Sequence, residues 1–72
     1  MSMPEMIPVD SSNVAAVGYD AEEQEIYVEF LDSGVYKYTG PDQQTFDELL
    51  GAPSVGSFLN RAIKPNYPYT RL

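Results

Sequence analysis

The chain has 72 residues and a formal net charge of −7, from 11 acidic and four basic residues. It contains neither cysteine nor histidine, which excludes disulfide bonds and metal sites built on thiolate or imidazole ligands. The length predicts one small domain with a modest core, and no apolar run approaches the roughly 20 residues of a membrane-spanning helix.

The first half of the chain has the pattern of an antiparallel sheet. Residues 1–6 show no periodicity and predict a flexible N-terminal tail, followed by a single domain over residues 7–72. Residues 14–19 predict a first strand. Residues 24–31 alternate, with Ile26, Val28 and Phe30 on one face of a second strand. A turn at residues 32–34 leads into a third strand over residues 35–39.

The second half predicts two helices. Pro41 suits the first turn of a helix and Asp42 suits its positive end, while Gly51 is expected just after its last residue. Ser54 then caps a second helix that reaches Lys64 and is stopped by Pro65. Its apolar stripe is Val55, Leu59, Ala62 and Ile63, and its polar stripe is Ser57, Asn60, Arg61 and Lys64.

These elements predict an α+β fold, in which a three-stranded antiparallel β-meander is followed by two short helices packed on one face. The apolar face of the second strand must then meet both helical stripes. The expected core consists of Ile26, Val28, Phe30, Phe46, Leu49, Leu59 and Ile63.

Charge is unevenly distributed along the chain. Residues 1–36 hold eight acids and no base, whereas residues 37–72 hold three acids and all four bases. Cations gathered next to tyrosines in an acidic molecule suggest a local anion site. Four cations cannot neutralise a long nucleic-acid track, so a compact ligand with one or two phosphates, or a short RNA feature, fits better than a polymer.

Hydrogen-bond donors and aromatic rings define the candidate ligand site. The predicted ligand-binding residues are Tyr36, Lys37, Tyr38, Ser54, Gly56, Ser57, Asn60, Arg61 and Lys64. A helix start can bind phosphate through its free amides, and tyrosine faces can stack on a base. Each residue also has a structural interpretation. The tyrosines can pack on the helices, Ser54 can act only as a cap, and Arg61 and Lys64 can pair with the acidic half.

Several blocks of the sequence resemble the KTSC domain, a family named for its occurrence at the C-terminus of some lysyl-tRNA synthetases and also found as short bacterial and phage proteins. The blocks keep the family's order and spacing and lie within residues 7–67. They are residues 7–13, 17–20, 28–30, 33–38 (SGVYKY) and 52–64, followed by Tyr67. The resemblance implies an association with RNA through the synthetase context, while the strong acidity of this chain disfavours binding to polymeric RNA.

We interpret the chain as a non-catalytic binding module for a nucleotide or a short RNA feature, without catalytic residues, metal or cofactor. The expected setting is the cytoplasm of a bacterial cell, with a phage gene as an alternative origin, no membrane association and a possible homodimer. One alternative function is a phage accessory protein that sequesters a cyclic nucleotide immune signal. Another is a protein–protein adaptor with no small ligand.

Overall fold

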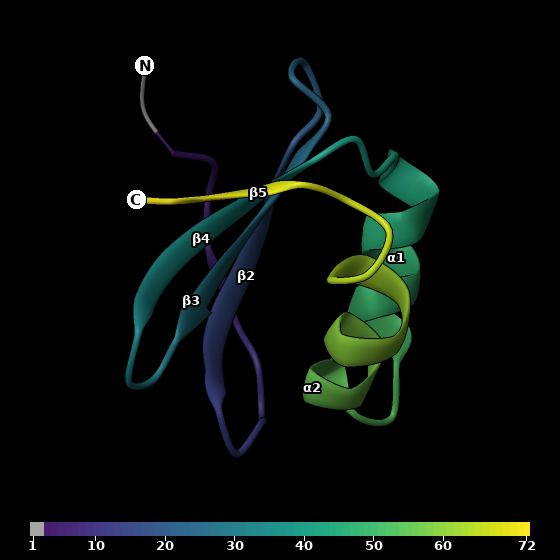
Figure 1. Cartoon of the computed structure of the whole chain (residues 1–72). Coiled ribbons are helices and arrows are strands. Elements are labelled where there is room, and N and C mark those ends of the chain that lie inside the picture. Colours follow the sequence, from purple (N-terminus) through teal and green to yellow (C-terminus); the bar gives the residue numbers. More distant parts are fainter. Residues whose placement is uncertain (1–2) are drawn as a thin grey trace.

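The computed structural model describes residues 3–72 and contains one five-stranded antiparallel sheet with the helices on one side of it (Figure 1). Each strand pairs with the next strand of the chain. The strands are β1 (Ile7–Pro8), β2 (Val14–Asp20), β3 (Glu25–Phe30), β4 (Gly34–Thr39) and β5 (Tyr69–Arg71). The helices are α1 (Gln43–Gly51), α2 (Val55–Phe58) and the π-helical η1 (Leu59–Ile63).

The predicted fold class is confirmed, since an antiparallel sheet is followed by two short helical segments on one face. The number of strands differs, because β1 and β5 were not predicted. These strands have two and three residues, too few for an alternating pattern to be visible in the sequence. Both are edge strands that pair with a predicted strand, β1 with β2 and β5 with β4.

The core lies between the inner face of the sheet and the helices. Val28 on β3 is opposite Val17 on β2 and Tyr36 on β4, so one face of three strands points toward the helices. A register shift between Val14 and Ala16 keeps both Val14 and Val17 on that face. The fully or nearly buried cluster is Val14, Val17, Ile26, Val28, Tyr38, Phe46, Leu49, Val55, Leu59 and Ile63.

The core prediction is confirmed for six of its seven residues and corrected for Phe30. Phe30 points to the predicted face and packs against the cluster, but it is only partly buried. It is the last residue of β3, immediately before the turn that leads into β4. Beyond that point the helices do not cover the sheet completely, so the Phe30 ring stays accessible at the edge of the core.

The start of α1 differs slightly from the prediction. Asp42 is the N-cap, and its carboxylate accepts hydrogen bonds from Thr45 N at 2.9 Å and from the Thr45 hydroxyl at 2.7 Å. These bonds lower the pKa of Asp42 below its usual range. Pro41 precedes the cap instead of lying in the first turn, and its carbonyl accepts a hydrogen bond from the Tyr19 hydroxyl. Gly51 is the last helical residue, not the residue after the helix.

The second predicted helix is present, but it changes type midway. Ser54 caps it as predicted, since its Oγ accepts a hydrogen bond from Ser57 N at 3.3 Å. After Phe58 the turns widen to a π-helix, in which Lys64 N donates to Leu59 O. Val55, Leu59 and Ile63 of the predicted apolar stripe are buried, and its fourth member, Ala62, is half-buried.

The N-terminal segment crosses the outer face of the sheet at Gly18. A Cβ atom added to Gly18 would lie 2.7 Å from Glu5 O and 2.8 Å from Met6 Sδ, so the segment depends on the glycine for its close approach. The predicted flexible tail begins in residues 1 and 2, which lie outside the described residues, and its flexibility stays a prediction. In residues 3–72, no helix combines the length and apolarity that crossing a membrane demands.

We expect Gly18→Ala to displace residues 4–6 and to lower the free energy of unfolding by about 1 kcal/mol, the low end for overpacked sites, because a terminal segment can move away. Urea unfolding measures this loss. Gly51→Ala is the matched control, because no atom lies within 4 Å of the added Cβ and alanine favours a helix. A Gly18→Ala variant as stable as Gly51→Ala would contradict the tight packing.

Candidate functional site

A pocket of about 390 Å³ opens where the inner face of the sheet meets the end of η1. Cross-strand pairing builds its wall, because Tyr38 on β4 is opposite Tyr69 on β5. Tyr36, two residues before Tyr38, lies on the same face. We call this the aromatic pocket. Its lining residues are Asn13, Phe30, Asp32, Ser33, Tyr36, Tyr38, Lys64 and Tyr69.

The four rings of the pocket contact one another in a chain. Phe30 and Tyr36 meet edge to face with their centroids 5.4 Å apart. Tyr69 lies at a tilt to both Tyr36 and Tyr38, at centroid distances of 5.5 and 5.9 Å. Such contacts hold aromatic side chains in defined orientations, and the rings therefore form a preshaped wall.

Two cations lie against this wall. The Lys64 ammonium is 5.2 Å from the centre of the Phe30 ring, and the Arg71 guanidinium is 6.0 Å from the centre of the Tyr36 ring. Both distances fall within the range of cation–π attraction. Lys64 lines the pocket itself, so its charge faces any molecule that enters.

Tyr38 has a buried ring and an unpaired hydroxyl. The residue is 3% exposed, and its hydroxyl has no hydrogen-bond partner among residues 3–72, whereas that of Tyr19 donates to Pro41 O at 2.8 Å. No side-chain polar atom in that range is both fully buried and unpaired. The Tyr38 hydroxyl therefore keeps contact with solvent, and Tyr38 is one of the residues that line the aromatic pocket.

Burial raises the pKa of the Tyr38 hydroxyl above its usual range, and the neighbouring Tyr36 and Tyr69 hydroxyls raise it further. Tyr38 is therefore a neutral phenol at physiological pH. A neutral phenol can donate a hydrogen bond to an oxygen atom of a ligand.

A second hollow, of about 400 Å³, lies at the start of α2. We call it the serine hollow. It is lined by Asp10, Ser11, Ser12, Asn13, Pro53, Ser54, Val55, Gly56, Ser57 and Asn60. Asn13 lines both this hollow and the aromatic pocket, so the two are neighbours.

Gly56 is explained by a contact within the protein. A Cβ atom added to Gly56 would lie 2.9 Å from Asn13 Oδ1, which also accepts a hydrogen bond from the Ser11 hydroxyl at 3.1 Å. The glycine thus makes room for Asn13 at the border of the two hollows. The group that approaches Gly56 closely is therefore a side chain of the same chain.

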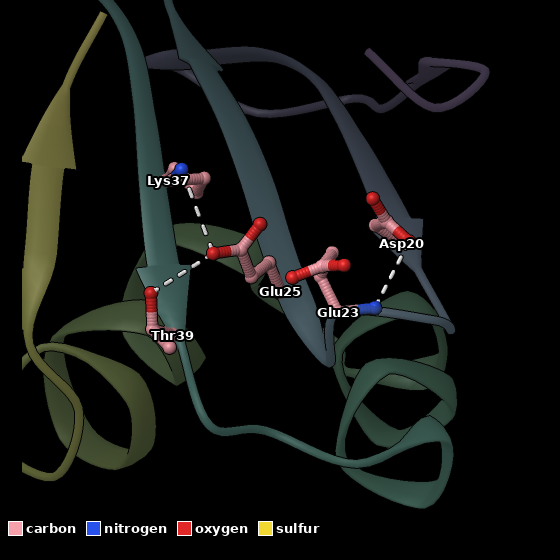
Figure 2. A network of polar contacts seen from close by, with 5 residues as sticks. All are labelled: Asp20, Glu23, Glu25, Lys37 and Thr39. Carbon is pink, nitrogen blue, oxygen red and sulfur yellow. Dashed lines mark hydrogen bonds and ion pairs between the residues drawn. The ribbon is translucent and has the colours of Figure 1, made fainter. Parts of the chain in front are cut away.

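Lys37 lies apart from both hollows. Because Tyr36 and Tyr38 face the helices, Lys37 between them points to the outer face of the sheet. Its ammonium is 3.5 Å from a Glu25 carboxylate oxygen, which also accepts a hydrogen bond from the Thr39 hydroxyl (Figure 2). Lys37 therefore pairs with the acidic half of the chain, whereas the pairing expected for Arg61 and Lys64 is absent from residues 3–72.

The structure divides the predicted site residues into three groups. Tyr36, Tyr38 and Lys64 line the aromatic pocket. Ser54, Gly56, Ser57 and Asn60 line the serine hollow. Lys37 and Arg61 line neither, and the Arg61 guanidinium stacks over the Phe58 ring at 5.5 Å.

Five lining residues of the aromatic pocket were missing from the prediction: Asn13, Phe30, Asp32, Ser33 and Tyr69. Phe30 had been assigned to the core, and Asp32 and Ser33 only to a turn. Tyr69 belongs to the unpredicted strand β5. The one available signal was the density of tyrosines near the C-terminus, which has no periodicity from which a position could be assigned.

Comparisons with known proteins agree with one another. The sequence profile of the KTSC domain matches residues 10–67. A protein of Tsukamurella paurometabola is 40% identical over 62 residues, covering 86% of this chain and 92% of that protein. A protein of Stutzerimonas stutzeri is 34% identical over 67 residues, covering 92% and 94%. The crystal structure of a KTSC domain protein from Yersinia pestis aligns with a TM-score of 0.91 at 26% identity, covering 94% of this chain and 96% of that one.

Proposed function

The chain belongs to the KTSC domain family, and from that premise we propose that it is a small non-catalytic binding module for a phosphate-bearing, nucleotide-like ligand. The ligand is a nucleotide or a short RNA feature, and the aromatic pocket is its site. The observation that carries the proposal is the Tyr38 hydroxyl, which is unpaired within residues 3–72 and lies on an otherwise buried side chain of that pocket.

The pocket has a complement for each part of a nucleotide. The rings of Tyr36 and Tyr69 offer a stacking surface for a base, which aromatic side chains bind with little sequence preference. Lys64 supplies a positive charge and Tyr38 a hydrogen-bond donor for a phosphate oxygen. Arg71, against Tyr36, adds positive potential beside the base.

The serine hollow suits the sugar better than a second phosphate. Its serine hydroxyls and the Asn60 amide can both donate and accept hydrogen bonds, as sugar hydroxyls do. Asp10 lines the same hollow and carries a negative charge, which repels phosphate. The phosphate is therefore assigned to the Lys64 side and the sugar to the Asn13 border.

The proposal limits the size of the ligand. A net charge of −7 leaves no continuous basic surface for a polymer, so affinity should depend on salt with the slope of one or two phosphate contacts. We propose that this binding takes place in the bacterial cytoplasm. We also propose that the protein forms a two-fold homodimer and that its gene is of phage origin.

A thermal-shift screen with 5′-mononucleotides, cyclic nucleotides and short oligoribonucleotides tests the proposal. A ligand at ten times its Kd stabilises the folded state by about 1.4 kcal/mol, which is roughly 6–11 °C in a domain of this size. We expect such a shift with at least one nucleotide. A shift confined to cyclic nucleotides would favour the sequestering role, and no shift with any probe would favour the adaptor.

A further inference from the structure

Asp32 brings a carboxylate to the same pocket as Lys64. It lies in the turn between β3 and β4, and its Oδ1 accepts a hydrogen bond from the Ser33 hydroxyl at 3.3 Å. No basic side chain of residues 3–72 forms an ion pair with it. The second carboxylate oxygen and the remaining lone pairs are therefore available to a bound molecule.

The two opposite charges orient a ligand. A phosphate is attracted to Lys64 and repelled by Asp32, so the part of the ligand that lies beside Asp32 must donate hydrogen bonds. With the phosphate at Lys64 and the base against the tyrosine rings, that part is an edge of the base. This step rests on the function proposed above.

The four common bases differ at that edge. Guanine presents two adjacent donors, N1–H and the 2-amino group, which match the two oxygens of a carboxylate. Adenine and cytosine present one amino donor beside a ring nitrogen that accepts, and uracil presents one N–H between two carbonyls. A carboxylate next to an acceptor is repelled, whereas a paired, charge-assisted contact is strong and specific.

We propose that Asp32 is a specificity-determining residue that selects a guanine base. Ser33 positions it, because the Ser33 hydroxyl donates a hydrogen bond to Oδ1 of Asp32 and both residues line the aromatic pocket. The ligand class is then a guanine nucleotide with its phosphate at Lys64.

Calorimetric titration with 5′-GMP, 5′-IMP and 5′-AMP at one fixed salt concentration tests this assignment. A charge-assisted pair predicts that GMP binds at least roughly tenfold more tightly than AMP, with IMP, which lacks the 2-amino group, in between. Asp32→Asn should abolish the preference by weakening GMP alone. Glu29→Gln is the matched control. It removes the same charge as Asp32→Asn, but Glu29 is exposed on the outer face of the sheet.

The outcomes separate this inference from the proposed function. If the wild-type protein binds GMP and AMP equally, or if Asp32→Asn keeps the preference for GMP, the assignment of Asp32 is overturned while nucleotide binding stands. If none of the three nucleotides binds the wild-type protein but other nucleotides do, the guanine class is overturned. If no nucleotide binds at all, the proposed function fails and the inference fails with it.

Discussion

Leu49→Ala is expected to lower the free energy of unfolding by about 2–5 kcal/mol, the usual loss for a buried leucine that leaves a cavity. Leu49 has no exposed surface and lies in the central cluster, where α1 meets the sheet. A domain of 72 residues buries a smaller share of its unfolded surface than a larger domain does, and it starts from low stability. The variant should therefore be partly or wholly unfolded at 37 °C.

Leu50→Ala provides a control with the same chemistry one residue further along α1. Leu50 is 39% exposed, so its truncation removes fewer packed contacts and leaves no closed cavity. We expect less than half of the loss seen for Leu49→Ala. Thermal unfolding followed by circular dichroism compares the two variants, since each kcal/mol of lost stability lowers the melting temperature by about 4–8 °C. Equal losses at both positions would mean that α1 is rotated relative to the structure described here.

Lys64→Ala is expected to weaken nucleotide binding by about 1.5–3 kcal/mol, or roughly 10- to 150-fold, the range for a hydrogen bond to a charged group. Lys64 is the basic residue that lines the aromatic pocket. Its ammonium lies over Phe30 and has no carboxylate partner among residues 3–72. Its removal should therefore change stability little while reducing affinity, as titration calorimetry would measure.

Arg61→Ala is the matched control, because Arg61 is three residues earlier on the same helical segment and stacks over Phe58 outside both hollows. It removes the same charge, so a general electrostatic effect would weaken binding equally in both variants. Tyr38→Phe removes only the hydroxyl and keeps the buried ring. Loss of affinity in Lys64→Ala and Tyr38→Phe, but not in Arg61→Ala, is expected. Loss of affinity in Arg61→Ala alone would contradict the assignment of the phosphate to the aromatic pocket.

Much of the fold follows from local patterns. The alternation of Ile26, Val28 and Phe30 requires one buried face, and Gly34 takes the positive φ of 89° that the hairpin turn needs. Asp42 and Ser54 have side chains that accept hydrogen bonds from free backbone amides, and both act as caps. These features depend on residues within a few positions of one another, and for that reason they can be read from the sequence.

The candidate site shows the limit of that reasoning. The sequence placed Tyr36 and Tyr38 on one face and Lys64 on a polar stripe, but it could not tell that these surfaces meet while Lys37 and Arg61 point elsewhere. Which surfaces meet is set by how the helices pack on the sheet, and packing depends on contacts between residues far apart in the chain.

Strand β5 is the clearest case of a feature that tertiary structure alone decided. Tyr69–Arg71 has too few residues to show a period, and it is a strand because β4 offers it a free edge. That pairing brings Tyr69 against Tyr36 and Tyr38 and completes the wall of the aromatic pocket. The sequence by itself determined the elements, their buried faces and their caps, because those are local. The pocket came from pairing and packing across the chain, because its lining extends from Asn13 to Tyr69.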